Sequence, residues 1–139
     1  MLDAALRDAL RARLDESRRA LLGALEGLTE HDFGADLGGG QTIVQALAAL
    51  AEIEQRENAE VRTEAATAPA AGRPLPPQVV HALAGASYRS RRYLEADDAD
   101  VSSAKALVDG IVEREASLAE RIRQRPPTPP PPVFPMAQP

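Results

Sequence analysis

The chain of 139 residues contains no cysteine and no tryptophan, and aromatic residues make up only 3% of it. Without cysteine it can form no disulfide, no thiolate metal site and no thiolate nucleophile, which fits a protein of a reducing compartment. The N-terminal residues include acids and no continuous apolar run, so we predict neither a signal peptide nor a membrane-spanning segment. We therefore expect a cytoplasmic protein with no membrane partner.

Positive charge is also scarce. The 16 lysine and arginine residues are outnumbered by 21 aspartates and glutamates, which gives a formal net charge of -5. A local basic cluster of Arg89, Arg91 and Arg92 has acids on both sides. Because nucleic-acid binding depends on cations that neutralise phosphates, we predict no nucleic-acid partner. We interpret these arginines as a solvated helix face with ion pairs.

Proline is missing from most of the chain, since all 12 prolines lie in residues 69–77 and 126–139. Proline lacks a backbone donor and clashes with the preceding helical turn, so long helices can form only in the proline-free stretches. The length suits a single hydrophobic core. We predict an all-α fold with one domain, a four-helix bundle over residues 1–125, followed by a proline-rich extended tail over residues 126–139.

Four stretches of the chain show apolar residues at the three- and four-residue spacing of an α-helix. In the first stretch they are Leu2, Leu6, Leu10, Leu14, Leu21, Leu25 and Leu28, and in the second Ile43, Leu47, Leu50, Ile53 and Val61. In the third they are Val80, Leu83 and Leu94, with Ser87 between them, and in the fourth Val101, Ala104, Val108, Ile111, Leu118 and Ile122, with Glu115 among them. We predict that these positions form the inner faces of the four helices.

Local signals mark where the helices begin. Thr42 with Gln45 three positions later has the form of a capping box at the start of the second helix. Pro76 and Pro77 suit the first turn of the third helix, and Asp100 is a candidate N-cap for the fourth. The alanine- and proline-rich linker between the second and third helices is long enough for a crossover along the bundle.

Three segments of this pattern, residues 27–33, 41–54 and 107–122, resemble the DinB-like superfamily of small bacterial four-helix proteins. The resemblance extends over residues 2–125 and implies a crossover connection between helices 2 and 3. Family members typically begin helix 2 with a tryptophan, carry a histidine near its second turn and place a His-x-x-x-His pair on helix 4. The resemblance implies that these three histidine positions bind a divalent metal for a transfer or hydrolysis reaction.

The chain departs from the family pattern at every one of these positions. The tryptophan position is Gln41, the first histidine position is Ala49, and the paired positions are Arg114 and Leu118. Alanine and leucine have no lone pair to offer, and the charge of arginine repels a cation. We therefore predict that the family metal is lost, with no cofactor in its place and no catalytic residue of the family type.

No other catalytic pattern is complete in the sequence. The two histidines, His31 and His81, belong to no nucleophile motif and to no Glu-x-x-His pair of a bundle metal site. Glu115 lies within an apolar stripe, where a carboxylate requires a partner. We interpret it as a structural carboxylate that either pairs with an arginine of a neighbouring helix or tilts outward to water, in preference to a catalytic acid.

Two functions remain. The first is a noncatalytic DinB-like bundle that binds a small apolar molecule or a partner helix, or that forms a homodimer through a small-residue face such as Ala82, Gly85 and Ala86. The alternative is a metal-dependent transferase or hydrolase of the same superfamily with a relocated site, built from Glu115, His81 and Tyr88. For both functions the candidate pocket residues are His81, Tyr88, Glu54, Glu115 and Arg114.

Overall fold

The computed structural model describes residues 2–62 and 76–125. These residues form five helices: α1 (Ala4–Leu25), α2 (Glu30–Phe33), α3 (Ile43–Val61), α4 (Pro76–Leu94) and α5 (Val101–Gln124). They contain no β-strand, only an isolated bridge between Asp36 and Thr42. The all-α prediction is confirmed, whereas the predicted tail, residues 126–139, lies outside the described residues. None of the described helices is both long and apolar enough to span a lipid bilayer.

Side chains next to the helix starts supply the hydrogen-bond acceptors that the first turns lack. Both bonds of the predicted capping box are present, with Gln45 N–H donating to Thr42 Oγ1 at 3.2 Å and Thr42 N–H donating to Gln45 Oε1 at 2.9 Å. Asp100 accepts a hydrogen bond from the N–H of Ser103 at 2.9 Å, so this predicted N-cap is also confirmed. Asp3 caps α1 in the same way.

The short helix α2 is an element that the apolar pattern did not predict. It begins with a second capping box, formed by Thr29 and Asp32. A turn of three glycines, residues 38–40, follows it, and all three have positive φ angles, which side chains with a Cβ rarely adopt. This turn brings the chain back to Thr42, where α3 begins.

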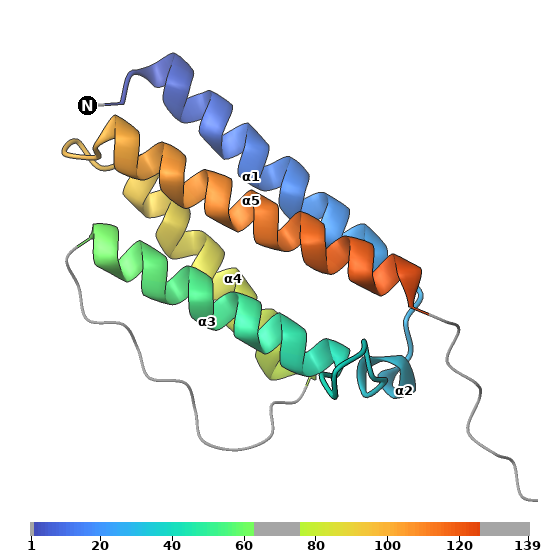
Figure 1. The fold of residues 1–139 in the computed structure, drawn as a ribbon. Helices are drawn as coiled ribbons and strands as arrows, with labels where there is room; N and C mark the ends of the chain where they lie inside the picture. The colour runs from blue at the N-terminus through green and yellow to red at the C-terminus, as the bar shows by residue number, and fades with distance from the viewer. Residues whose placement is uncertain (1, 63–75, 126–139) are drawn as a thin grey trace, which may run out of the picture.

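The four long helices lie side by side (Figure 1). α1 packs mainly against α5, and α3 packs mainly against α4. α1 and α5 run in one direction, while α3 and α4 run in the other. Because α3 and α4 are parallel, the chain between them has to join opposite ends of the structure. The predicted crossover connection falls on residues 63–75, which lie outside the described residues.

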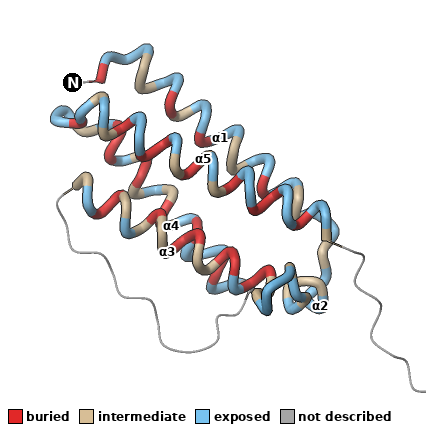
Figure 2. Tube along the Cα trace, in the orientation of Figure 1, coloured by how far each residue is buried: buried red, intermediate tan, exposed pale blue. Residues whose placement is uncertain are grey.

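Two apolar clusters agree with these directions. The first joins the ends of α1 and α5 to the beginnings of α3 and α4, and includes Leu21, Ile43, Val79, Leu83 and Ile122. The second joins the beginnings of α1 and α5 to the end of α4, and includes Leu10, Leu14, Tyr93, Leu107 and Ile111. Figure 2 shows the buried positions recurring along the faces that the helices turn toward one another.

The predicted inner faces are buried or half-buried on α1, α3 and α5, but one prediction on α4 is wrong. Val80 is 54% exposed, and the neighbouring Val79 is buried in its place. Ser87 is only half-buried, whereas Ser90 is completely buried. Two adjacent valines fit the helical spacing almost equally well, so the sequence pattern could not separate the two registers.

Candidate functional site

Four polar side chains are buried between the long helices. Glu54 and Asn58 on α3, Ser90 on α4 and Glu115 on α5 are each at most 2% exposed. Burying polar groups without partners is costly, so these side chains have to bond to one another or to the backbone. Arg18 on α1 completes the group with a side chain that is 14% exposed. We refer to these five residues as the polar cluster, to which every long helix contributes.

Arg18 holds the cluster together. Its Nε donates to Glu115 Oε2 at 2.9 Å, its Nη2 donates to Glu54 Oε2 at 3.2 Å, and its Nη1 donates to the carbonyl oxygen of Leu83 at 3.3 Å. The planar guanidinium, with donors in a fixed fork, thus connects α1 to the other three long helices. Of the two arrangements predicted for Glu115, the structure shows the pairing with an arginine of a neighbouring helix and not the outward tilt to water.

A count of protons fixes the roles of Ser90 and Asn58. Ser90 Oγ lies 2.9 Å from Glu54 Oε1 and 3.1 Å from the carbonyl oxygen of Ala86, but a hydroxyl can donate only once. Asn58 Nδ2 has two protons and lies 3.1 Å from the same carbonyl oxygen and 3.2 Å from Ser90 Oγ. Every acceptor is satisfied when Asn58 donates to Ala86 and Ser90, and Ser90 donates to Glu54.

Burial raises the pKa of the Glu54 carboxyl above its ordinary value of 4.5. The charge of Arg18 and the hydrogen bond from Ser90 act in the opposite direction, and the nearby Glu115 carboxylate adds to the rise. All four oxygens of the two carboxylates accept a hydrogen bond from Arg18 or Ser90. No carboxylate oxygen of the cluster is therefore left free to bind a substrate. We interpret the polar cluster as structural.

A groove of about 340 Å³ lies between α3 and α5. Its aliphatic lining consists of Ala46, Ala49, Leu50, Ile53 and Leu118. Its polar lining consists of Gln41, Glu113, Arg114, Ser117 and Arg121. α3 and α5 make fewer contacts with each other than either makes with its main neighbour, which leaves space between them. We call this feature the α3–α5 groove.

All four positions that the family resemblance singles out line this groove. They are Gln41 and Ala49 on the α3 side, and Arg114 and Leu118 on the α5 side. Histidines at Ala49, Arg114 and Leu118 would therefore face a common space. In this chain the same three positions carry two aliphatic side chains, Ala49 and Leu118, and one cation, Arg114.

The charge of Arg114 is paired within the protein. Its Nη1 and Nη2 donate to the two carboxylate oxygens of Glu57 on α3, at 2.8 and 2.6 Å. A Cβ on Gly110, one turn earlier in α5, would lie 3.1 Å from Arg114 Nη1 and 3.4 Å from Glu57 Oε2. Glycine at this position thus makes room for a bidentate ion pair that links α3 to α5.

A second hollow of about 410 Å³ is larger but less suited to binding. Its lining residues, Arg19, Leu22, Gly23, Leu25 and Glu26, all belong to α1 and its C-cap. A hollow formed along one helix presents no opposing wall to a ligand, whereas the α3–α5 groove has walls from two helices. We therefore take the smaller groove as the candidate site.

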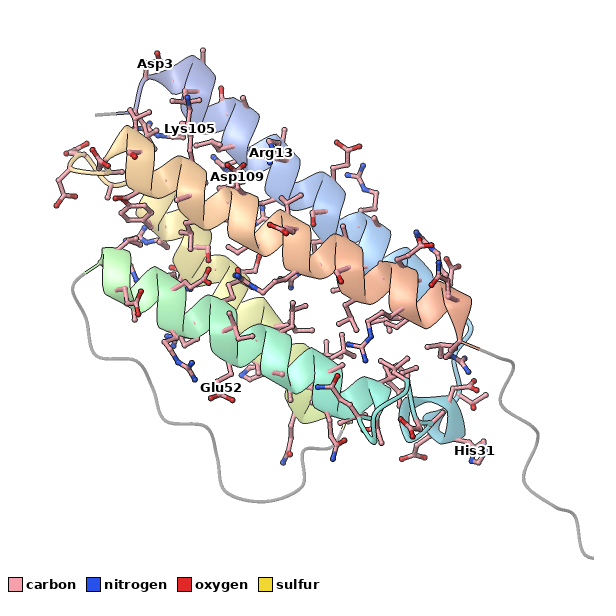
Figure 3. The ribbon with its side chains drawn as sticks, viewed as in Figure 1. Asp3, Arg13, His31, Glu52, Lys105 and Asp109 are labelled. Carbon is pink, nitrogen blue, oxygen red and sulfur yellow. The ribbon has the colours of Figure 1, made fainter. Side chains whose placement is uncertain are left out.

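The structure does not bring the five predicted pocket residues together. Glu54 and Glu115 lie in the polar cluster, and Arg114 lines the groove, but His81 is exposed and Tyr88 is 63% exposed. The other histidine, His31, projects from α2 at one end of the molecule (Figure 3). Within residues 2–62 and 76–125 no three side chains of His, Asp or Glu are grouped so that they could hold a metal ion.

The small-residue face predicted for a homodimer, Ala82, Gly85 and Ala86, is not exposed as one continuous surface. Ala86 is only 1% exposed because it faces the core, where its carbonyl oxygen accepts the hydrogen bond from Asn58. Ala82, four positions earlier, is exposed. A second copy of the chain therefore cannot contact Ala82 and Ala86 together, and this part of the dimer prediction is wrong.

Comparisons of this chain with protein-family models, with curated proteins and with solved structures found no match. The function is therefore inferred from the residues of this chain.

The sequence pattern did not predict the role of Arg18, although a signal was present. The leucine stripe of α1 skips from Leu14 to Leu21, and Arg18 occupies the position between them.

Proposed function

We propose that the protein is a four-helix bundle of the DinB-like type whose α3–α5 groove binds a small apolar molecule, without a metal ion and without catalysis. The observation that carries this proposal is the convergence of Gln41, Ala49, Arg114 and Leu118 on one groove. The first and last of these positions are 77 residues apart in the sequence. Their convergence supports the register on which the family resemblance depends.

The chemistry of the groove favours an apolar ligand. Its aliphatic lining consists of alanine, leucine and isoleucine side chains, which offer a ligand apolar contact and no hydrogen bond. Arg114 neither repels nor attracts a ligand strongly, because both oxygens of Glu57 neutralise it. The volume of about 340 Å³ lies near the lower limit of ligand sites, which suits a small molecule.

Blocking the groove tests this proposal. Octanamide, a small neutral amphiphile, serves as the probe, and its binding to the full chain is measured by calorimetry in the presence of a chelator. Ala49→Phe places a ring in the groove, and we expect it to weaken octanamide binding by about tenfold or more. Ala116→Phe is the matched control, because Ala116 is exposed on α5 and does not line the groove. Equal binding by both variants and the unmodified protein would contradict the proposal.

The alternative is a metal-dependent transferase or hydrolase with a relocated site. It requires His81 and Tyr88 to lie beside Glu115, whereas both side chains are exposed and Glu115 is bonded to Arg18. Metal analysis of the purified protein discriminates between the two functions. Stoichiometric zinc, nickel or iron that disappears in His81→Ala would favour the enzyme and count against the groove proposal.

Self-association is a second candidate function, favoured by the large apolar side chains that remain exposed. Val80 and Tyr88 on α4 are 54% and 63% exposed, and Leu22 on α1 is 50% exposed. We expect a homodimer that buries the exposed side of α4. Sedimentation should show dimers that dissociate in Tyr88→Glu. A monomer at all concentrations in the unmodified protein would exclude this function.

A further inference from the structure

We propose that the ligand of the α3–α5 groove is a monocarboxylate with an apolar body, and that Arg121 and Gln41 bind its carboxylate. This inference rests on the proposed function of the groove and specifies the chemical class of its ligand. It follows from how charge is distributed along the groove.

Arg121 is the one groove cation whose charge has no carboxylate partner among the described residues. Its guanidinium is exposed, and its Nη1 donates to the neutral amide oxygen of Gln41 at 3.3 Å. Arg114, in contrast, has both oxygens of Glu57 within 2.8 Å. Arg121 also lies in the last turn of α5, where a cation is favourable near the helix C-terminus, but that interaction occupies none of its donors.

Gln41 adds further donors to the same end of the groove. Its side-chain oxygen accepts the hydrogen bond from Arg121, which leaves the side-chain NH₂ group as a donor. Both side chains line the groove, and they come from opposite walls. Together they offer a ligand several hydrogen-bond donors and one positive charge. A carboxylate, which accepts and carries a negative charge, is the complementary group.

The other end of the groove carries a negative charge, that of Glu113. Glu113 lies eight residues before Arg121 on α5, a separation of about 12 Å along the helix axis, and it is exposed. The negative charge of Glu113 disfavours an anion at that end and orients the ligand with its carboxylate toward Arg121. The aliphatic side chains of Ala46, Ala49, Leu50 and Leu118 then remain for the apolar body.

The size of the groove limits that body. A volume of about 340 Å³ equals the share of about eleven water molecules in the liquid. This space suits a chain or ring with on the order of ten heavy atoms. Octanoate therefore serves as the probe, and octanamide is its neutral counterpart of the same size.

The test compares both probes on three proteins by calorimetry: the full chain, Arg121→Gln and Arg123→Gln. Arg123 is the matched control, because it is exposed two residues away on the same helix and donates to the carbonyl oxygen of Ala20, outside the groove. We expect the full chain to bind octanoate more tightly than octanamide. Arg121→Gln should weaken octanoate binding about tenfold and octanamide binding much less, and Arg123→Gln should alter neither.

The outcomes separate this inference from the function on which it rests. If octanamide binds as tightly as octanoate, or if Arg121→Gln leaves octanoate binding unchanged, the carboxylate assignment is overturned while the apolar groove stands. If Arg121→Gln weakens both probes equally, Arg121 shapes the groove and does not bind the charge, which also overturns the assignment. If neither probe binds, the proposed function and this inference both fail.

Discussion

Glu54 on α3 and Glu115 on α5 accept hydrogen bonds from one guanidinium, that of Arg18 on α1, at 3.2 and 2.9 Å. The two glutamates are each at most 2% exposed. Because two buried carboxylates share one cation, removal of the Arg18 side chain would leave both charges without their partner.

Replacing Arg18 by methionine should therefore be strongly destabilising. Methionine retains much of the volume but leaves two buried carboxylates without their cation, and we expect a loss of about 3–5 kcal/mol in the free energy of unfolding. Urea denaturation measures this loss. Arg13→Met is the matched control: Arg13 also pairs with an acid of α5, Asp109 at 2.7 Å (Figure 3), but both side chains are exposed and the pair contributes about 1 kcal/mol or less. Similar losses in the two variants would refute the role of Arg18.

The raised pKa of Glu54 predicts how stability depends on pH. A carboxyl group with a higher pKa in the folded state binds its proton more tightly there than in the unfolded chain. The stabilisation that this tighter proton binding gives to the folded state is fully present below the ordinary pKa of 4.5. It is lost as the pH rises through the folded-state pKa of Glu54. Relative to Glu54→Gln, the unmodified protein should lose stability as the pH rises above 4.5 and through the folded-state pKa of Glu54. Urea denaturation across this range measures the difference, and a difference that grows in favour of the unmodified protein would contradict the expectation.

Two glycines inside helices should respond differently to alanine. Alanine is favoured over glycine in a helix by about 1 kcal/mol. Gly23→Ala in α1 should gain most of this stabilisation, because none of the neighbouring atoms lies within 4 Å of the added Cβ. Gly110→Ala in α5 should gain less or lose stability, because its Cβ would lie 3.1 Å from Arg114 Nη1. Thermal unfolding measures both variants, and an equal gain would show that the Arg114–Glu57 pair shifts at no cost.

Histidines introduced at the three positions that the resemblance singles out test its register. Ala49→His, Arg114→His and Leu118→His together place three imidazoles along one groove, and we expect the triple variant to bind Zn²⁺ or Ni²⁺ that the unmodified protein does not bind. Calorimetry with each ion measures the affinity. A triple variant that remains folded, as judged by circular dichroism, yet binds neither ion would show that the three positions are placed incorrectly.

The sequence predicted the all-α class and the four long helices because these helices are long and strongly periodic. The leucine stripe of α1, the capping box of Thr42 and Gln45 and the N-cap at Asp100 depend on local spacing, which the sequence displays directly. The inner face of α4 was placed incorrectly because Val79 and Val80 are adjacent and equally apolar. The short α2 has too few residues to show any period.

The polar cluster was only partly predictable, and the reason is physical. Each of its members fills a position of an apolar stripe: Arg18 between Leu14 and Leu21, Glu54 and Asn58 between Leu50 and Val61. Such gaps show that a polar residue faces the core, but not which residue it meets there. Arg18 and its partners are separated by 36 and 97 residues, so only the packing of the helices reveals the pairing. The groove could not be predicted from composition, because it depends on how closely α3 approaches α5.

The most direct test of the groove is a titration of the ¹⁵N-labelled protein with octanamide, followed by NMR in the presence of a chelator. We predict shifts of amide resonances along both walls of the α3–α5 groove, around Ala49 and Leu50 on α3 and around Ser117 and Leu118 on α5. Shifts confined to the hollow along α1, around Arg19 and Leu22, or shifts that appear only after a divalent metal is added, would contradict the account.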